Sequence, residues 1–264
     1  MKTQVGDIID SLEEIAPLHL QESYDNSGLI IGSREQEVTG ALISLDCTEE
    51  ILEEAMARGC NLIISHHPAV FYGVKTFTDA NPTERIIRKA IKNDLIIYAI
   101  HTNLDNTLKN GVNERIAKKI GLNIDGILRP LAENPMLGAG LMGYFTAPMP
   151  ENQFLQHVKK EMGATLIRHT RLTNRQIQKV AVIGGSGAFL LEEAIAAGAD
   201  ALITADFKYH NFFDVDDALL ACDIGHYESE QYTIDLIQEL ISGKFATFAA
   251  HCTEINTNPV HYFT

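Results

Sequence analysis

Residues 51–65 read ILEEAMARGCNLIIS, and residues 190–204 read LLEEAIAAGADALIT. At a constant offset of 139 residues the two stretches share seven of fifteen positions, including Leu-Glu-Glu-Ala-x-Ala-x-Gly. Each has the pattern of a helix, a glycine where a helix C-cap favours positive φ, and an apolar strand. Apolar runs precede both, ALISLD (41–46) and VAVIGG (180–185), so each copy predicts strand, helix, glycine stop and strand.

The similarity continues further along the chain with a shifted offset. The runs LIIYAIHTNLD (95–105) and LLACDIGHYESE (219–230) both end in His-x-x-x-carboxylate. Alternating strands and helices predict α/β domains, so we expect two similar, duplicated domains with largely parallel sheets flanked by helices on both faces. The alternative is a chance likeness between two α/β units, because caps and strands recur in every such fold.

Prolines and glycines cluster between residues 130 and 150 and suggest a boundary between the domains near residue 128. The first domain is then 1–127 and the second 128–225, with the C-terminal segment, about 226–264, returning to the first as a strand and an ordered tail. The N-terminal stretch predicts an amphipathic helix with its apolar face on Ile8, Ile9, Leu12 and Ile15.

The composition is that of a globular protein, with 45% hydrophobic and 21% charged residues. The formal charge of −14 and the lack of a basic run disfavour binding to a nucleic acid polymer. We also expect no membrane span and no targeting segment. The four cysteines show no close pairing motif and are expected to be free thiols in a reducing compartment, which favours the cytoplasm.

The tetrapeptide Ser65-His66-His67-Pro68 directly follows an apolar strand pattern. Ligand groups in open α/β sheets gather at the carboxyl ends of strands. Adjacent histidines on a regular strand would point to opposite faces, but the proline favours a turn from which both rings can serve neighbouring metals. A surface pair of histidines is the alternative.

Two further clusters carry metal-type ligands at predicted strand ends. Asp105 follows His101 in the first turn of an expected helix, although Asn103 or Asp105 can also be a simple cap. His226 and Glu230, at i and i+4, project from one helix face, although a solvated pair has the same spacing. Together the three clusters offer six side chains as ligands, four imidazoles and two carboxylates. One tetrahedral ion takes only four ligands, so this number suits two ions.

We therefore expect two divalent metal ions bound by His66, His67, Asp105, His226 and Glu230, with Glu230 as the bridge. His101 is left open between a ligand, a hydrogen-bond partner of a ligand and a catalytic proton carrier. Nitrogen and oxygen ligands without thiolate fit zinc, manganese, iron or nickel.

Candidate substrate-binding residues lie in two other segments. The run Gly184-Gly-Ser-Gly187 follows a strand, so Gly185 and Ser186 can hold an anion on backbone N–H groups, or the run is simply a tight turn. Asp206 occupies the position in the second repeat that corresponds to His67 in the first. It begins a polar segment that continues with Lys208, Tyr209 and His210. This polar segment either lines the same cleft as the metal ligands or caps a strand.

In combination, these motifs resemble the GTP cyclohydrolase type 2 homologues, also called NIF-three-like proteins. The resemblance rests on Tyr24-Asp-Asn-Ser-Gly-Leu29, the His-His-Pro turn, and the motifs at 101–105, 184–187, 206–210 and 225–230. It implies two similar α/β domains with a dinuclear metal site in the cleft between them, and homohexamers built as trimers of dimers. The family commonly has tryptophan at Tyr24 and glycine at Ala205, and the second departure puts the local cleft shape in doubt.

Two functions fit these observations. The first is a metal-dependent hydrolase acting on a small nucleotide-like, phosphoester or amide substrate, because two cations activate water and stabilise developing charge. The second is a non-catalytic metal-binding or scaffold assembly, because a fold and a ligand set do not establish turnover.

Overall fold

The computed structural model describes residues 3–263, and these divide into two compact units. Unit 1 contains the described residues up to Leu104 together with Thr233–His261. Unit 2 contains Asp105–Tyr232 together with residues 262–263. The two sheets flanked by helices confirm the predicted fold class.

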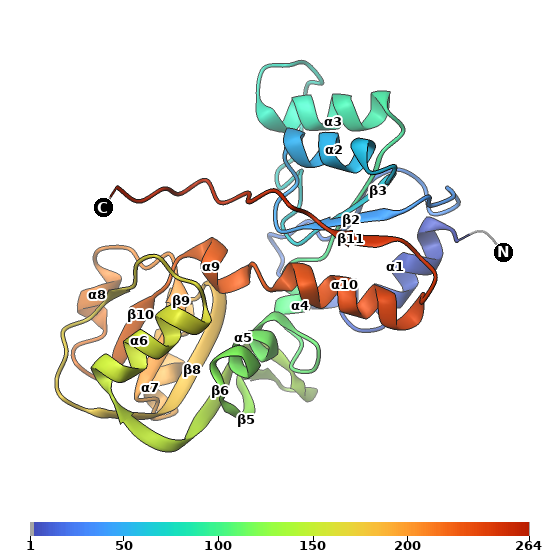
Figure 1. Ribbon diagram of the computed structural model, residues 1–264. Coiled ribbons are helices and arrows are strands. Elements are labelled where there is room, and N and C mark those ends of the chain that lie inside the picture. The colour runs from blue at the N-terminus through green and yellow to red at the C-terminus, as the bar shows by residue number, and fades with distance from the viewer. Residues whose placement is uncertain (1–2, 264) are drawn as a thin grey trace. The chain divides into compact units, whose positions relative to one another are not determined.

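Unit 1 is built on a five-stranded sheet in the order β1-β4-β3-β2-β11, in which only β1 is antiparallel to its neighbour. Helices α2 and α3 cover one face of this sheet, and α1 and α10 cover the other (Figure 1). The elements are α1 (Val5–Glu13), η1 (Leu18–Leu20), β1 (Gly28–Ile31), β2 (Ala41–Ser44), α2 (Glu49–Ala57), β3 (Leu62–Ser65), α3 (Pro82–Lys92), β4 (Ile96–Ala99), α4 (Thr102–Asp105), α10 (Thr233–Lys244) and β11 (Ala250–Cys252).

Unit 2 has a six-stranded sheet in the order β5-β6-β8-β9-β10-β7. Helices α5 and α6 pack on β6 and β8, while the core around α7 fills the other face. The elements are α5 (Val112–Ile120), β5 (Asn123–Leu131), β6 (Asn134–Pro150), α6 (Glu151–Glu161), β7 (Arg168–His169), β8 (Gln176–Ser186), η2 (Ala188–Leu190), α7 (Leu191–Ala196), β9 (Ala201–Ala205), α8 (Asn211–Asp214), β10 (Leu220–Asp223) and α9 (His226–Glu230).

The internal repeat corresponds to a shared topology. Strands β2, β3 and β4 run parallel in unit 1, as β8, β9 and β10 do in unit 2, with α2 or α7 between the first two strands. In both units an antiparallel edge strand, β1 or β7, pairs with the third strand. The two glycine stops, Gly59 and Gly198, have the same φ of +70°, which an L side chain adopts only at a cost.

The segment rich in proline and glycine has a different role from the one suggested by its composition. It forms most of β6, which pairs antiparallel with β5, and Pro130 lies on the edge strand β5, where a missing N–H is tolerated. The boundary expected near residue 128 falls inside β5, whereas the compact units divide after Leu104. The expectation of largely parallel strands holds for unit 1 but not for β5, β6 and β7 of unit 2.

Other expectations, among them the amphipathic N-terminal helix and the returning C-terminal strand, agree better with the structure. Ile8, Ile9 and Leu12 of α1 are buried, although Ile15 lies beyond the end of that helix. Strand β11 pairs in parallel with β2 in unit 1. All four cysteines are free thiols. Among the described residues, every helix is too short or too polar to cross a lipid bilayer.

Candidate metal centre

Three histidines gather at the carboxyl ends of two adjacent parallel strands in unit 1. His66 and His67 follow β3, and His101 follows β4, its neighbour in the sheet. One nitrogen from each ring lies within 4.8 Å of the other two. The ring centroids are 5.1 Å apart for His66 and His67, and 5.2 and 5.3 Å from each of these to His101. The three imidazoles could therefore hold one metal ion.

The orientation of each ring is fixed by an oxygen acceptor. Because these acceptors are a carbonyl and two carboxylates, each Nδ1 carries the proton and each Nε2 keeps its lone pair. Metal-binding histidines in proteins usually have this arrangement. The bonds run from His66 Nδ1 to the Ile100 carbonyl (2.8 Å), from His67 Nδ1 to Asp46 Oδ1 (2.8 Å) and from His101 Nδ1 to Asp25 Oδ1 (2.7 Å).

Asp25, which supports His101, is itself held by several hydrogen bonds. It accepts hydrogen bonds from the backbone N–H and the hydroxyl of Thr102, from Ser27 Oγ and from the Asn26 N–H. Burial alone would raise the pKa of Asp25, but the hydrogen bonds from His101 and Thr102 outweigh it and hold that pKa far below its usual range. Asp25 is thus an ionised acceptor that fixes the His101 ring.

Unit 2 contributes a second group of donors on the short helix α9. His226 Nε2 lies 3.0 Å from Glu230 Oε2 one turn later, and His226 Nδ1 lies 2.7 Å from Asp206 Oδ2. Burial would lower the pKa of His226, but the charge of Glu230 and the hydrogen bond to Asp206 raise it to about 11. In the absence of metal, His226 is therefore a cation held between two carboxylates.

Asp105, the last residue of α4, lies close to Glu230. One of its carboxylate oxygens lies within 4.8 Å of a Glu230 oxygen. Asn113, near the start of α5, holds the segment in place: its Nδ2 donates to the Asp105 carbonyl and its Oδ1 accepts the N–H of Gly184. Within unit 2, Glu230 therefore lies close both to His226 and to Asp105.

The glycine run at the end of β8 makes room for Glu230. Gly185 has a φ of +62°, and a Cβ there would overlap Glu230 Oε1 and stand 3.3 Å from His226 Cε1. Its N–H donates to Ser229 Oγ at 2.9 Å, and the following helix, η2, has three residues. The N–H groups of Gly184 and Gly185 are thus engaged within unit 2, while Ser186 is exposed.

The polar segment after β9, from Asp206 to His210, divides into two parts with different surroundings. Asp206 belongs with His226 through the hydrogen bond described above, and that bond lowers the pKa of Asp206. Lys208, Tyr209 and His210 are exposed. The rings of Tyr209 and His210 contact each other, and both contact Phe213 of α8.

Reasoning from the sequence did not find Asp25 or Asp46 as supports of the histidines. Both could have been suspected: Asp25 lies inside the Tyr24–Leu29 motif, and Asp46 ends the apolar run of β2 at the same edge of the sheet as His67. Asn113 and Ser229 were also missed, and nothing in the local sequence distinguishes them.

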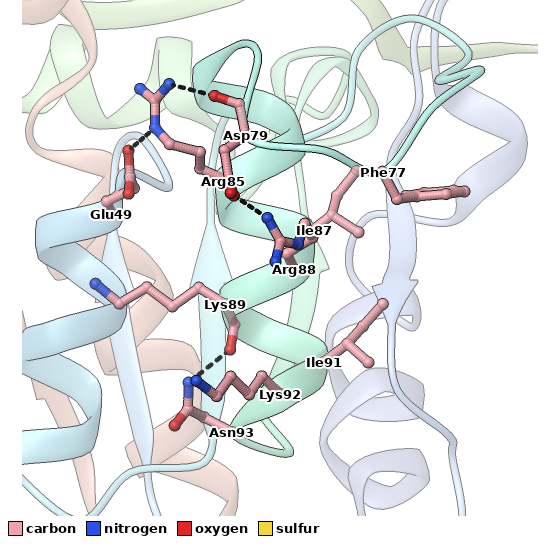
Figure 2. A pocket seen from close by; sticks show the side chains of 10 residues that line it. All are labelled: Glu49, Phe77, Asp79, Arg85, Ile87, Arg88, Lys89, Ile91, Lys92 and Asn93. Atoms are coloured by element: carbon pink, nitrogen blue, oxygen red, sulfur yellow. Dashed lines mark hydrogen bonds and ion pairs between the residues drawn. The ribbon is translucent and has the colours of Figure 1, made fainter.

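A separate pocket of about 510 Å³ lies along α3 in unit 1, and Figure 2 shows the side chains that line it. Its cationic groups are mostly paired: Arg85 binds Glu49, Arg88 binds Asp79, and Lys89 binds Glu53. No candidate metal ligand is among its lining residues in the described part of the chain.

Fold and donor groups together define the class: an α/β protein of two similar units whose histidine and carboxylate side chains could bind metal. The family model for Duf34/NIF3 (NGG1p interacting factor 3) matches residues 3–259. The chain belongs to this family.

Individual relatives extend over nearly the whole chain. Proteins named GTP cyclohydrolase 1 type 2 homolog are 35% identical in Clostridium perfringens (90% of this chain, 91% of the relative) and 32% identical in Clostridium acetobutylicum (97% and 94%). A hypothetical protein from Staphylococcus aureus has a similar crystal structure, with a TM-score of 0.92, 31% identity and 100% coverage of both chains. A Bacillus cereus protein related to NIF3 also has a TM-score of 0.92, with 26% identity and 99% coverage of both.

Proposed function

We propose that this protein binds two divalent metal ions through His66, His67, Asp105, His226 and Glu230, and that it is a metal-dependent hydrolase. The observation that carries the proposal is the histidine cluster of unit 1, where three rings are oriented by oxygen acceptors and offer nitrogens within 4.8 Å of one another. The substrate class is a small molecule with a nucleotide-like, phosphoester or amide group.

The chemistry of the donors supports metal binding in both units. Unit 1 offers three imidazoles, and unit 2 offers Glu230 close to both His226 and Asp105. The total exceeds the four ligands of a single tetrahedral ion. Nitrogen and oxygen donors without thiolate suit zinc, manganese, iron or nickel. Asp105 and Glu230 would supply the carboxylate ligands, and Glu230, the longer side chain of the two, would be the one able to reach both ions.

When bound, such ions lower the pKa of water and stabilise negative charge on a reacting oxygen. His101 is the proposed proton carrier. Its Nδ1 is held by the ionised Asp25, which keeps Nε2 available to accept a proton and favours the imidazolium that results. Asp46 and Asp206 bind Nδ1 of His67 and His226, and so fix the orientation of each ring for metal ligation.

The test uses two buried glutamates of the same helix as a matched pair. Glu230 and Glu228 both lie on α9 and both are buried, but only Glu230 belongs to a group of candidate ligands. Glu230→Gln is expected to lose bound metal and hydrolysis in a screen of nucleotides, phosphoesters and amides, while Glu228→Gln retains both. Equal metal content and activity in the two variants would contradict the proposed ligand set.

A second variant separates the two roles considered for His101. His101→Ala is expected to keep both ions and lose turnover, whereas loss of metal from this variant would make His101 a ligand. If the metal-loaded protein hydrolyses none of the compounds in the screen, the hydrolase proposal fails and a metal-binding or scaffold role remains.

A further inference from the structure

A group of aromatic side chains stands beside the histidine cluster in unit 1. Tyr24 and Tyr72 are 61% and 80% exposed, and Phe71 lies between them, with ring centroids 6.4 Å from Tyr24 and 5.0 Å from Tyr72. The Phe71 ring also meets His101 in a T-shaped contact at 6.2 Å. Exposed aromatic rings are therefore continuous with the candidate metal centre.

Hydrogen bonds hold this aromatic group in place. Asn26 Nδ2 donates to the Val70 carbonyl at 2.6 Å, and the Asn26 N–H donates to Asp25, the residue that holds His101. The far side of the same loop is also anchored, because Glu84 of α3 accepts hydrogen bonds from Thr76 and Thr78. The rings are thus positioned relative to His101 by the fold.

We propose that Tyr24, Phe71 and Tyr72 form a platform on which a planar heteroaromatic ring of the substrate stacks. Large exposed aromatic surfaces next to a polar site are typical of ligand recognition. Flat rings bind aromatic side chains through their π faces with little dependence on the hydrogen-bonding pattern of the ring. The platform therefore selects for a planar ring, while the metal centre contacts the polar group to be hydrolysed.

This inference rests on the proposed metal centre, so metal content is measured beside ligand binding in every variant. The probes are guanosine 5′-monophosphate and nicotinamide mononucleotide, which carry different planar rings, and ribose 5-phosphate, which carries none. Binding of each probe to the manganese-loaded protein is measured by calorimetry. The wild type is expected to bind both nucleotides more tightly than ribose 5-phosphate.

The variants test the individual rings. Tyr24→Ala and Tyr72→Ala are each expected to weaken nucleotide binding about tenfold, the usual effect of removing one stacking side chain, without changing metal content or the affinity for ribose 5-phosphate. Tyr24→Phe keeps the ring and is expected to bind as the wild type does. Phe77→Ala is the matched control, because Phe77 is a 62% exposed aromatic of the same loop that lines the separate pocket of Figure 2.

Three results would overturn the platform. They are equal binding of the nucleotides and ribose 5-phosphate by the wild type, unchanged nucleotide affinity in both alanine variants, and loss of metal from these variants. The first two leave the metal centre intact if metal content is normal. The third would make the rings supports of the metal centre instead of a surface for the substrate.

Discussion

Gly185→Ala is expected to disturb the metal centre without altering any ligand. The new Cβ would overlap Glu230 Oε1 and stand 3.2 Å from its Cδ. Glu230 is only 3% exposed, so its carboxylate must shift within closely packed surroundings, which disturbs its 3.0 Å contact with His226. Gly198→Ala is the matched control, because that glycine has a similar positive φ, +70° against +62°, and an added Cβ there meets nothing within 4 Å.

The magnitudes follow from these two environments. An alanine in the left-handed region costs about 1–2 kcal/mol in either variant. Displacing Glu230 from its charged partner adds about 1.5–3 kcal/mol in the Gly185 variant alone. Because Glu230 is a proposed ligand, affinity for metal is expected to fall by about 10–100-fold, the usual effect of misplacing the surroundings of a ligand.

Two assays are needed to separate stability from metal binding. Urea unfolding of the metal-free proteins measures the loss of stability, and competition with a chelator measures the affinity for zinc. Gly185→Ala should be less stable than Gly198→Ala and should bind zinc more weakly. Equal zinc affinity in the two variants would refute the reasoning, because it would mean that Glu230 and its surroundings do not contribute to the site.

Three further predictions follow from the same structure. Asp46→Asn weakens zinc binding by about tenfold or more, because it removes the anionic acceptor of His67; Asp10→Asn, which alters an exposed partner of Arg34, should leave the affinity unchanged. In the metal-free protein, the raised pKa of His226 contributes to the free energy of unfolding; this contribution is fully present below pH 6.5 and is lost as pH rises toward about 11. The difference in unfolding free energy between wild type and His226→Asn should therefore shrink over that range. A difference that stays constant with pH would contradict this prediction. On the family resemblance we expect a homohexamer, with a mass by light scattering of about 175 kDa, six times the 29.2 kDa chain; a monomeric mass would contradict this.

The sequence predicted those features that depend on local pattern. Matching Leu-Glu-Glu-Ala segments and glycine stops located α2 and β3 in one unit and α7 and β9 in the other, because helix caps and apolar runs are local signals. The histidines could be predicted as a group because each follows a buried strand, and adjacent parallel strands end at the same edge of a sheet.

Other features depend on contacts between distant residues and could not be predicted. Pro130 and Gly138 resemble a linker in composition, yet they pair with each other across the hairpin of β5 and β6. The helix expected at His226 and Glu230 is the short α9, and the helix that follows it directly, α10, belongs to the other unit. The pairing of Asp25 with His101 spans 76 residues of the chain, so no local pattern announces it.

The proposed function requires that this protein bind metal through His66, His67, Asp105, His226 and Glu230. Its most direct test is elemental analysis of purified protein after loading with zinc or manganese and removal of unbound ions. We predict two ions per chain in the wild type and a clear loss in both His66→Ala and His226→Ala. Wild-type protein with no retained metal, or full metal content in both variants, would contradict the claim.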